Sequence, residues 1–312
     1  MVDEETADLL TVDEICNKVN GYKKLEIAND VERITTFIDI QQKCLFYVTT
    51  AWTMGFTGYV IDYGAYPDQQ RRYYSLRDIS KTLPRAKPGA RLEGAIFAGL
   101  QNLTNHIHES VYLRDDGAEM TNDLTLIDAN WGMSTDIVHQ FCRNTNHRGR
   151  IMPAHGRYVG ASSRSFSDYA KRKGERVGYN WRMPTVKGKR VVRHVLFDSN
   201  FWKSFVHARL SQSLGDPGCL SLFKAKPSTH QMLADHCHAE YRIKTTGRGR
   251  EVDEWKLLPN KPDNHFLDCL SGSAVAASVT GCNLSGINNR SAEDLAMQGE
   301  TKRTRRERVT YL

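Results

Sequence analysis

Three short segments near the start of the chain, at 34–40, 44–53 and 56–62, are rich in β-branched and aromatic residues. This composition is typical of β-strands. The polar linkers between them, Gln41–Lys43 and Met54–Gly55, are short enough to be hairpin turns. The pattern therefore predicts three consecutive antiparallel strands.

Further along the chain, segments with helical spacing alternate with strand-like segments. Apolar residues recur every three or four positions between 90 and 107, which predicts an amphipathic helix. Residues 123–128 predict a strand, and after a turn at Gly132 the apolar positions within 137–142 predict another helix. Strand, turn and helix in this order are typical of α/β proteins, which bind ligands at the carboxyl ends of their strands. Further helices are expected at 7–24, 201–214, 230–238 and 263–277, and further strands at 191–198, 239–246 and 252–258.

The ends of the chain differ from its middle. Thr11 and Glu14 have the spacing of a capping box, and Val12, Ile15 and Val19 follow at helical intervals. We expect residues 1–30 to be a lead-in helix and linker, 31–282 to be the main domain, and 283–312 to be a basic tail that is mobile when unbound.

The composition is that of an ordinary globular protein. The 312 residues are 40% hydrophobic and 25% charged, without the run of about 18 apolar residues that a membrane span needs. The acidic N-terminus is unlike a secretory signal. The seven cysteines are scattered and form no CxxC pair, which favours buried reduced thiols over disulfides or structural zinc. A net charge of +7 points weakly to a polyanionic partner.

Three acids stand in apolar surroundings at the ends of predicted elements: Asp39, Asp128 and Asp268. A carboxylate there is costly to desolvate unless it is paired or binds a cation. Structural alternatives exist, since Asp39 can cap a turn and Asp268 can interact with the dipole of its helix. His265 precedes Asp268 by three residues and shares its helical face.

Three carboxylates that converge on one pocket repel each other, and divalent cations remove that conflict. Oxygen ligands suit Mg²⁺ or Mn²⁺. Two such ions can activate water and stabilise the leaving 3′-oxygen during phosphodiester cleavage. In this hypothesis Asp39 bridges both ions, Asp128 and Asp268 each hold one, and His265 orients water or contacts the scissile phosphate.

Residues 157–190 form an insertion in which basic residues greatly outnumber acids and aromatic residues are interleaved. Clustered cations and aromatic rings suit a DNA backbone, although a solvated charged loop is the structural alternative. The expected DNA contacts are Arg164, Lys171, Arg172, Lys173, Arg176, Lys187, Lys189 and Arg190. His236, Cys237 and His238 are adjacent, so they point in different directions on a helix and make a poor metal site.

The order of these motifs carries a resemblance. The hairpin with Asp39, the segment Leu126–Gly132 with Asp128, and the segment Asn264–Cys269 with Asp268 resemble the nuclease domain of phage terminase large subunits, within them the GpA-type, lambda-like group. The segment Phe197–Lys203 and the turn Asp216–Gly218 are similar to parts of that group, and the resemblance covers residues 15–280.

The resemblance implies an α/β, ribonuclease H-like fold with a central mixed sheet, an antiparallel hairpin at its start and flanking helices. It implies metal-dependent cutting of concatemeric, double-stranded viral DNA in the host cytoplasm. Asp39, Asp128 and Asp268 carry over as ligands of two Mg²⁺ or Mn²⁺ ions. The implied partners are DNA, a terminase ATPase domain or subunit, the small terminase subunit and the portal, with no membrane.

The sequence departs from a whole terminase. It lacks the GxxxxGK[ST] loop, so the ATPase motor is absent from the chain. The second acid is often Glu in the family, whereas Asp128 is one methylene shorter. The basic insertion has no evident counterpart. A Holliday-junction resolvase or integrase of the same fold, and a non-catalytic basic DNA-binding packaging protein, remain alternatives.

Overall fold

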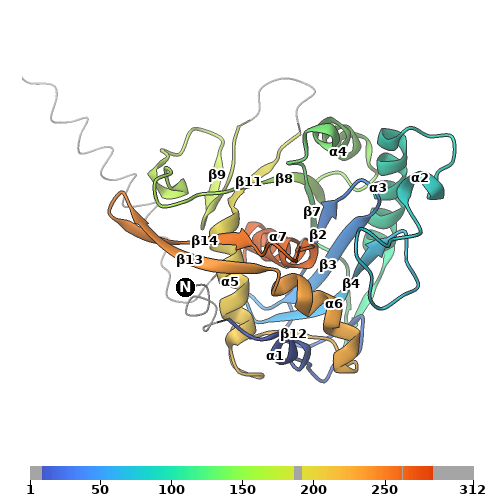
Figure 1. Cartoon of the computed structure of the whole chain (residues 1–312), viewed down its shortest axis with the longest axis horizontal. Helices are drawn as coiled ribbons and strands as arrows, with labels where there is room; N and C mark the ends of the chain where they lie inside the picture. The colour runs from blue at the N-terminus through green and yellow to red at the C-terminus, as the bar shows by residue number, and fades with distance from the viewer. Residues whose placement is uncertain (1–8, 186–191, 262, 284–312) are drawn as a thin grey trace, which may run out of the picture.

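The computed structural model describes residues 9–185, 192–261 and 263–283. Its centre is a mixed sheet of nine strands with helices packed on both faces (Figure 1). In spatial order the strands are β12 (Leu220–Leu222), β4 (Gly58–Tyr66), β3 (Leu45–Trp52), β2 (Arg33–Ile40), β7 (Leu124–Asp128), β8 (Ile151–Arg157), β11 (Val195–Asp198), β10 (Trp181–Met183) and β9 (Arg176–Gly178).

The predicted hairpins form one side of this sheet. Strands β2, β3 and β4 pair antiparallel in sequence order, and the backbone N–H of Gln41 donates to the carbonyl of Cys44 at 2.9 Å in the first turn. On the other side of β2, strands β7, β8 and β11 are added in parallel. This order is the ribonuclease H-like arrangement, so the predicted fold class is confirmed.

Two layers of helices bury the faces of the sheet. One layer contains α7 (His265–Thr280) with α1 (Val12–Cys16), α5 (Ser199–Ser211) and α6 (Pro227–Cys237), and the other contains α2 (Leu83–Ala86), α3 (Leu92–Glu109) and α4 (Gly132–Asn144). Successive side chains of β2 point to opposite faces, so Phe37 packs in the α7 layer and Ile38 in the α3 layer. Even-numbered and odd-numbered residues of β2 therefore pack into different hydrophobic cores, one on each face of the sheet.

The helix α7 approaches the sheet closely because its sequence offers small residues. A Cβ atom added at Gly272 meets the ring of Phe37 at 1.9 Å, which is well inside van der Waals contact. A glycine is therefore needed where α7 crosses β2, and the close approach brings the first turn of α7 near the end of that strand.

The remaining strands form two smaller sheets. One joins β1 (Glu26–Ile27), β5 (Tyr112–Arg114) and β6 (Glu119–Met120). The other is the hairpin of β13 (Glu240–Gly247) and β14 (Arg250–Leu257), which projects beside the basic insertion (Figure 1). Both strands of this hairpin agree with the sequence prediction.

The N-terminal helix is shorter than predicted. The capping box of Thr11 and Glu14 is present, but α1 ends at Cys16. Beyond it the backbone pairs with the edge of the sheet, where the N–H of Asn20 donates to the carbonyl of Leu222 at 2.9 Å. Pairing with a strand edge has replaced the helical hydrogen bonds that the apolar spacing predicted.

The described part of the basic insertion, 157–185, contains regular secondary structure. It contains β9, β10 and the 3₁₀ helix η1 (Phe166–Asp168), and β10 pairs antiparallel with β11. The strand β8 just before it was missed because Pro153 and Gly156 interrupt its pattern.

Two further acids have structural partners. Asp62 lies within β4, where it accepts from the hydroxyl of Tyr47 at 3.1 Å and pairs with Lys24 at 2.7 Å. Asp263 precedes Asn264, the cap position of α7, and accepts from the N–H of Leu76 at 3.1 Å.

The seven cysteines are buried free thiols. Among the described residues, no helix is both long and apolar enough to cross a bilayer. The expected basic tail lies outside the described residues from position 284 onward.

Candidate active site

Asp39 lies near the carboxyl end of β2 and is held by two side chains. Nδ1 of His265 donates to Oδ2 of Asp39 at 2.7 Å, and Nε2 of Gln41 donates to the two carboxylate oxygens at 3.2 and 3.0 Å. The residue is 6% exposed. These partners are side chains, whereas a turn cap requires the N–H groups of the backbone.

Asp128 ends the neighbouring strand. Because Ile127 lies opposite Ile38 in parallel register, Asp128 follows on the same face of the sheet as Asp39. Its carboxylate accepts from the N–H of Asn130 at 3.3 Å. Burial, then the charges of Asp39 and Asp268, raise the pKa of Asp128 from 3.8 to about 8.

Asp268 reaches the same place from the first turn of α7. Its side chain is 36% exposed, and Oδ1 lies 2.9 Å from Nζ of Lys203 on α5. Lys203 also pairs with the buried Glu240, at 2.5 Å. Burial alone lowers the pKa of Lys203, but the carboxylates of Asp268 and Glu240 raise it to about 12, so the ammonium stays charged.

The three carboxylates line one cavity of about 200 Å³, which we call the acid cavity. Lys203 and Ser199 also line it, and Ser271 contributes a hydroxyl that is buried without a hydrogen-bond partner. A buried hydroxyl without a partner is costly, which indicates that the cavity receives a polar group.

The donor chemistry of the acid cavity fits a hard divalent ion. Its anionic ligands are all carboxylate oxygens, the type that Mg²⁺ and Mn²⁺ prefer. As the side chains stand, no group of three or more His, Cys, Asp or Glu in the described segments is arranged to hold a metal ion. Lys203 and His265 supply positive charge to Asp268 and Asp39 in this arrangement.

His265 lies behind Asp39, outside the residues that line the acid cavity. Its ring stacks on Phe46 with centroids 4.5 Å apart, and its Nε2 lies 3.7 Å from Oδ1 of Asp263. Burial alone lowers the pKa of His265, but the carboxylates of Asp263 and Asp39 raise it to about 9. The placement suits orientation of Asp39 better than direct contact with water or phosphate.

Sequence reasoning missed the side chains that complete the site: Lys203, Ser199, Ser271 and Asn130. Two of them fall in the segment Phe197–Lys203, which the resemblance singled out without assigning a role. Ser271 follows Asp268 by three residues, so helical periodicity places it on the same face. That spacing was the available signal for Ser271.

The predicted DNA-binding residues are divided among several places. Arg164 and Arg172 line a second cavity within the insertion, and Lys171 and Arg176 line a third cavity beside the end of α7. Lys173 is exposed. Lys187, Lys189 and Arg190 lie outside the described residues.

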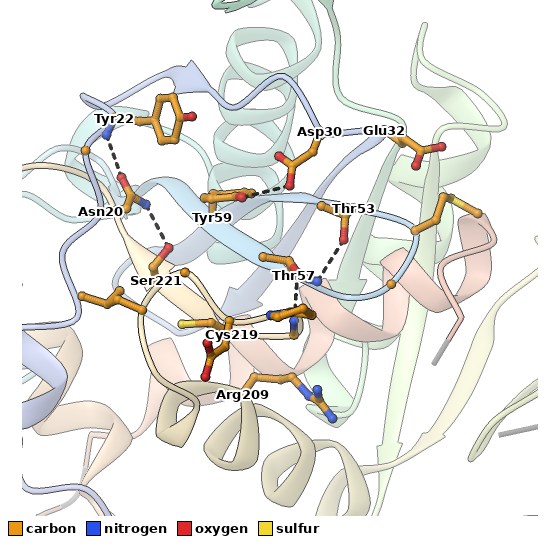
Figure 2. A pocket seen from close by; sticks show the side chains of 18 of the residues that line it. Asn20, Tyr22, Asp30, Glu32, Thr53, Thr57, Tyr59, Arg209, Cys219 and Ser221 are labelled. Atoms are coloured by element: carbon orange, nitrogen blue, oxygen red, sulfur yellow. Dashed lines mark hydrogen bonds between the residues drawn. The ribbon is translucent and has the colours of Figure 1, made fainter. Parts of the chain in front are cut away.

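A larger cavity lies elsewhere, at the opposite end of the β2–β3 hairpin from Asp39. It has a volume of about 1090 Å³ (Figure 2). Its polar groups bond to each other, as when Tyr59 donates to Asp30 at 3.1 Å and Asn20 to Ser221 at 3.0 Å. We therefore place the chemistry in the smaller acid cavity, where three carboxylates converge and the pKa of Asp128 is raised.

No curated protein matches the sequence. A distant structural likeness, with a TM-score of 0.41 and 11% identity, covers 85% of this chain and 98% of a solved chain. That chain is a lysine-to-alanine mutant of the nuclease domain of the large terminase subunit gp2 of bacterial virus Sf6, with manganese.

The family comparison covers nearly the whole chain. Residues 3–290 match the family described as terminase large subunit gpA, endonuclease domain. The matched range includes the acid cavity and both helix layers. The chain belongs to the family of the terminase large subunit gpA endonuclease domain.

Proposed function

We propose that this chain is a metal-dependent endonuclease that hydrolyses double-stranded DNA during packaging of a viral genome. The observation that carries the proposal is the meeting of Asp39, Asp128 and Asp268 on one cavity, with the pKa of Asp128 raised to about 8. Such a shift indicates an electrostatic conflict that a bound cation relieves. Membership of the endonuclease family supports the same reaction class.

The proposed cofactor is a pair of Mg²⁺ or Mn²⁺ ions, with Asp39, Asp128 and Asp268 as their ligands. Bound ions supply a low-pKa water and neutralise charge on the phosphate. The chain itself supplies orientation: His265 and Gln41 hold Asp39, and the carbonyl of Gly156 accepts from Nδ2 of Asn130 at 3.0 Å.

Lys203 contributes a fixed positive charge beside the acid cavity. Its ammonium stays protonated at neutral pH and is held between Asp268 and Glu240. A preorganised cation stabilises the charge that develops on a phosphate during cleavage, because it needs no reorganisation. We assign Lys203 to this role.

The wider setting follows from the family. We infer that the chain acts on concatemeric viral DNA in the host cytoplasm, together with a terminase ATPase domain or subunit, the small terminase subunit and the portal. The sequence of 312 residues lacks a phosphate-binding GxxxxGK[ST] loop. We therefore infer that the ATPase is a separate domain or subunit.

The direct test is nicking of supercoiled plasmid DNA in Mn²⁺ by the full chain and by Asp39→Asn, Asp128→Asn and Asp268→Asn. We expect wild-type nicking that EDTA abolishes, and loss of nicking in each folded variant. Cleavage of four-way junctions in preference to duplex would favour a resolvase instead. Salt-sensitive DNA binding without any metal-dependent cleavage would indicate instead a non-catalytic packaging protein that binds DNA.

A further inference from the structure

We propose that the basic insertion contains a binding pocket for unstacked nucleotides of a single DNA strand, next to the acid cavity. The inference rests on the proposed action on DNA and names the form of substrate that the site holds. The pocket is a cavity of about 620 Å³, within the size range of small-ligand sites. We call it the stacking cavity; six of its lining residues are Arg157, Tyr158, Arg164, Phe166, Tyr169 and Arg172.

The stacking cavity is built on a fixed framework. The guanidinium of Arg250 on β14 donates to the carbonyls of Gly160 and Ser163 at 2.9 and 2.5 Å. Glu254, also on β14, accepts from the N–H of Ala161 at 3.1 Å and from the hydroxyl of Tyr158 at 2.6 Å. Four hydrogen bonds thus tie the start of the insertion to the hairpin of β13 and β14. Figure 1 shows the insertion beside this hairpin.

The charges around the stacking cavity favour an anion. Arg182 is neutralised by Glu175 at 2.6 Å, and Arg164 donates to the uncharged carbonyl of Asp168. Across the described ranges, Arg157 and Arg172 have no ion pair within 4.0 Å. Uncompensated guanidinium groups bind phosphate well, so the cavity attracts a nucleotide backbone.

The aromatic side chains supply surfaces for bases. Tyr158 and Tyr169 are 54% and 44% exposed, so their rings are accessible to a ligand. The guanidinium of Arg164 lies 4.1 Å from the centre of the Tyr169 ring, and that of Arg182 lies 5.3 Å from it. Rings and guanidinium planes together are the surfaces on which single-stranded nucleic acids stack.

The position of the stacking cavity connects it to the cleavage site. Gly156 lines the acid cavity and Arg157, the next residue, lines the stacking cavity. The hydroxyl of Ser199, which lines the acid cavity, donates to the carbonyl of Arg157 at 3.1 Å. Because successive residues of β8 point to opposite faces of the sheet, the two cavities lie on different faces and adjoin at the carboxyl ends of β8 and β11. A strand with a phosphate at the acids reaches the stacking cavity around this edge of the sheet.

The volume selects the form of the ligand. A cavity of about 620 Å³ accommodates one or two nucleotides, whereas a DNA duplex is far larger. Stacking on protein rings also requires that the bases leave their own stack. The site therefore holds a frayed or unpaired strand beside the scissile phosphate.

Binding of fluorescein-labelled oligothymidylate, and of an abasic oligonucleotide of equal length, tests the inference by anisotropy. EDTA is present, so cleavage plays no part. Wild type should prefer the base-containing strand by about 5-fold to 150-fold, the equivalent of about 1–3 kcal/mol for one stacked base. The double variant Tyr158→Ala/Tyr169→Ala should lose that preference, and the matched variant Tyr158→Phe/Tyr169→Phe should keep it.

A second pair of variants tests the phosphate contact. Arg157→Gln should weaken binding of both oligonucleotides and flatten the salt dependence. Arg148→Gln, an exposed arginine before the opposite end of β8, is the matched control and should change neither. Either of two results overturns the proposed role of the stacking cavity: equal wild-type affinity for the two oligonucleotides, or a full base preference in the double alanine variant.

Plasmid nicking by the wild type in Mn²⁺, measured on the same preparation, separates this inference from the proposed function. Nicking without any base preference in binding refutes the stacking cavity alone. A tyrosine-dependent base preference without nicking refutes the nuclease alone.

Discussion

The ammonium group of Lys203 lies 2.9 Å from Oδ1 of Asp268 and joins α5 to α7 beside the acid cavity. The side chain of Lys203 is 12% exposed, and the same ammonium also pairs with Glu240. A buried cation between two acids has both a stabilising and a chemical consequence.

Replacement of Lys203 by Met leaves two acids without their common partner. We expect the metal-free protein to lose about 3–5 kcal/mol of unfolding free energy, the usual cost of breaking a buried pair on one side. Denaturant unfolding in EDTA measures the loss. Lys203→Arg keeps the charge and should retain most of the stability, and a Met variant as stable as wild type would contradict the pairing.

His265 should act on metal affinity through Asp39. His265→Ala removes the hydrogen bond of 2.7 Å that orients the carboxylate, and removal of such outer partners typically costs 10-fold to 100-fold in metal affinity or activity. The measurement is the Mn²⁺ concentration at half-maximal nicking. His265→Asn offers a donor at a similar place and should recover part of the loss. An unchanged half-maximal concentration in the alanine variant would remove His265 from this role.

Asp128 should make the metal-free protein pH-sensitive. Its folded pKa of about 8 exceeds the ordinary value of 3.8, so the folded chain binds this proton more tightly than the unfolded chain does. The resulting stability is fully present below about pH 4 and is lost as the pH rises to about 8. Melting temperatures in EDTA across this range should fall more steeply for wild type than for Asp128→Asn. Parallel curves for the two proteins would show that Asp128 ionises normally.

The contact between α7 and β2 should tolerate no extra methyl group. Gly272→Ala places a Cβ at 1.9 Å from the Phe37 ring, and overpacking of this kind typically costs about 1–3 kcal/mol. Chemical denaturation measures it, and Phe37→Leu in the same chain should restore part of the loss. Gly132→Ala is the matched control, since a Cβ there meets no atom within 4 Å.

The fold was largely predictable because local patterns were strong where the core is. The β-branched and aromatic composition of β2 and the helical spacing in α3 indicate elements that the core buries, and both elements appear close to their predicted positions. The order of motifs around the three acids indicated the protein family. Elements without such patterns were missed, as with β8, whose Pro153 and Gly156 conceal a central strand.

The sequence predicted the three acids of the candidate site, but not the side chains that contact them. Each acid ends or begins an element, which makes it visible in the sequence. Lys203 lies mid-helix among apolar and polar residues, and only tertiary packing places it between Asp268 and Glu240. Likewise the orientation of His265 toward Asp39 depends on the contact of α7 with β2, which no local pattern encodes.

The central claim is that the carboxylates of residues 39, 128 and 268 bind catalytic divalent ions together. Anomalous scattering from crystals of the full chain soaked in Mn²⁺ tests it most directly. We predict two manganese peaks within the acid cavity, both lost in Asp39→Asn. Crystals at saturating Mn²⁺ with no peak in contact with these three residues would contradict the account.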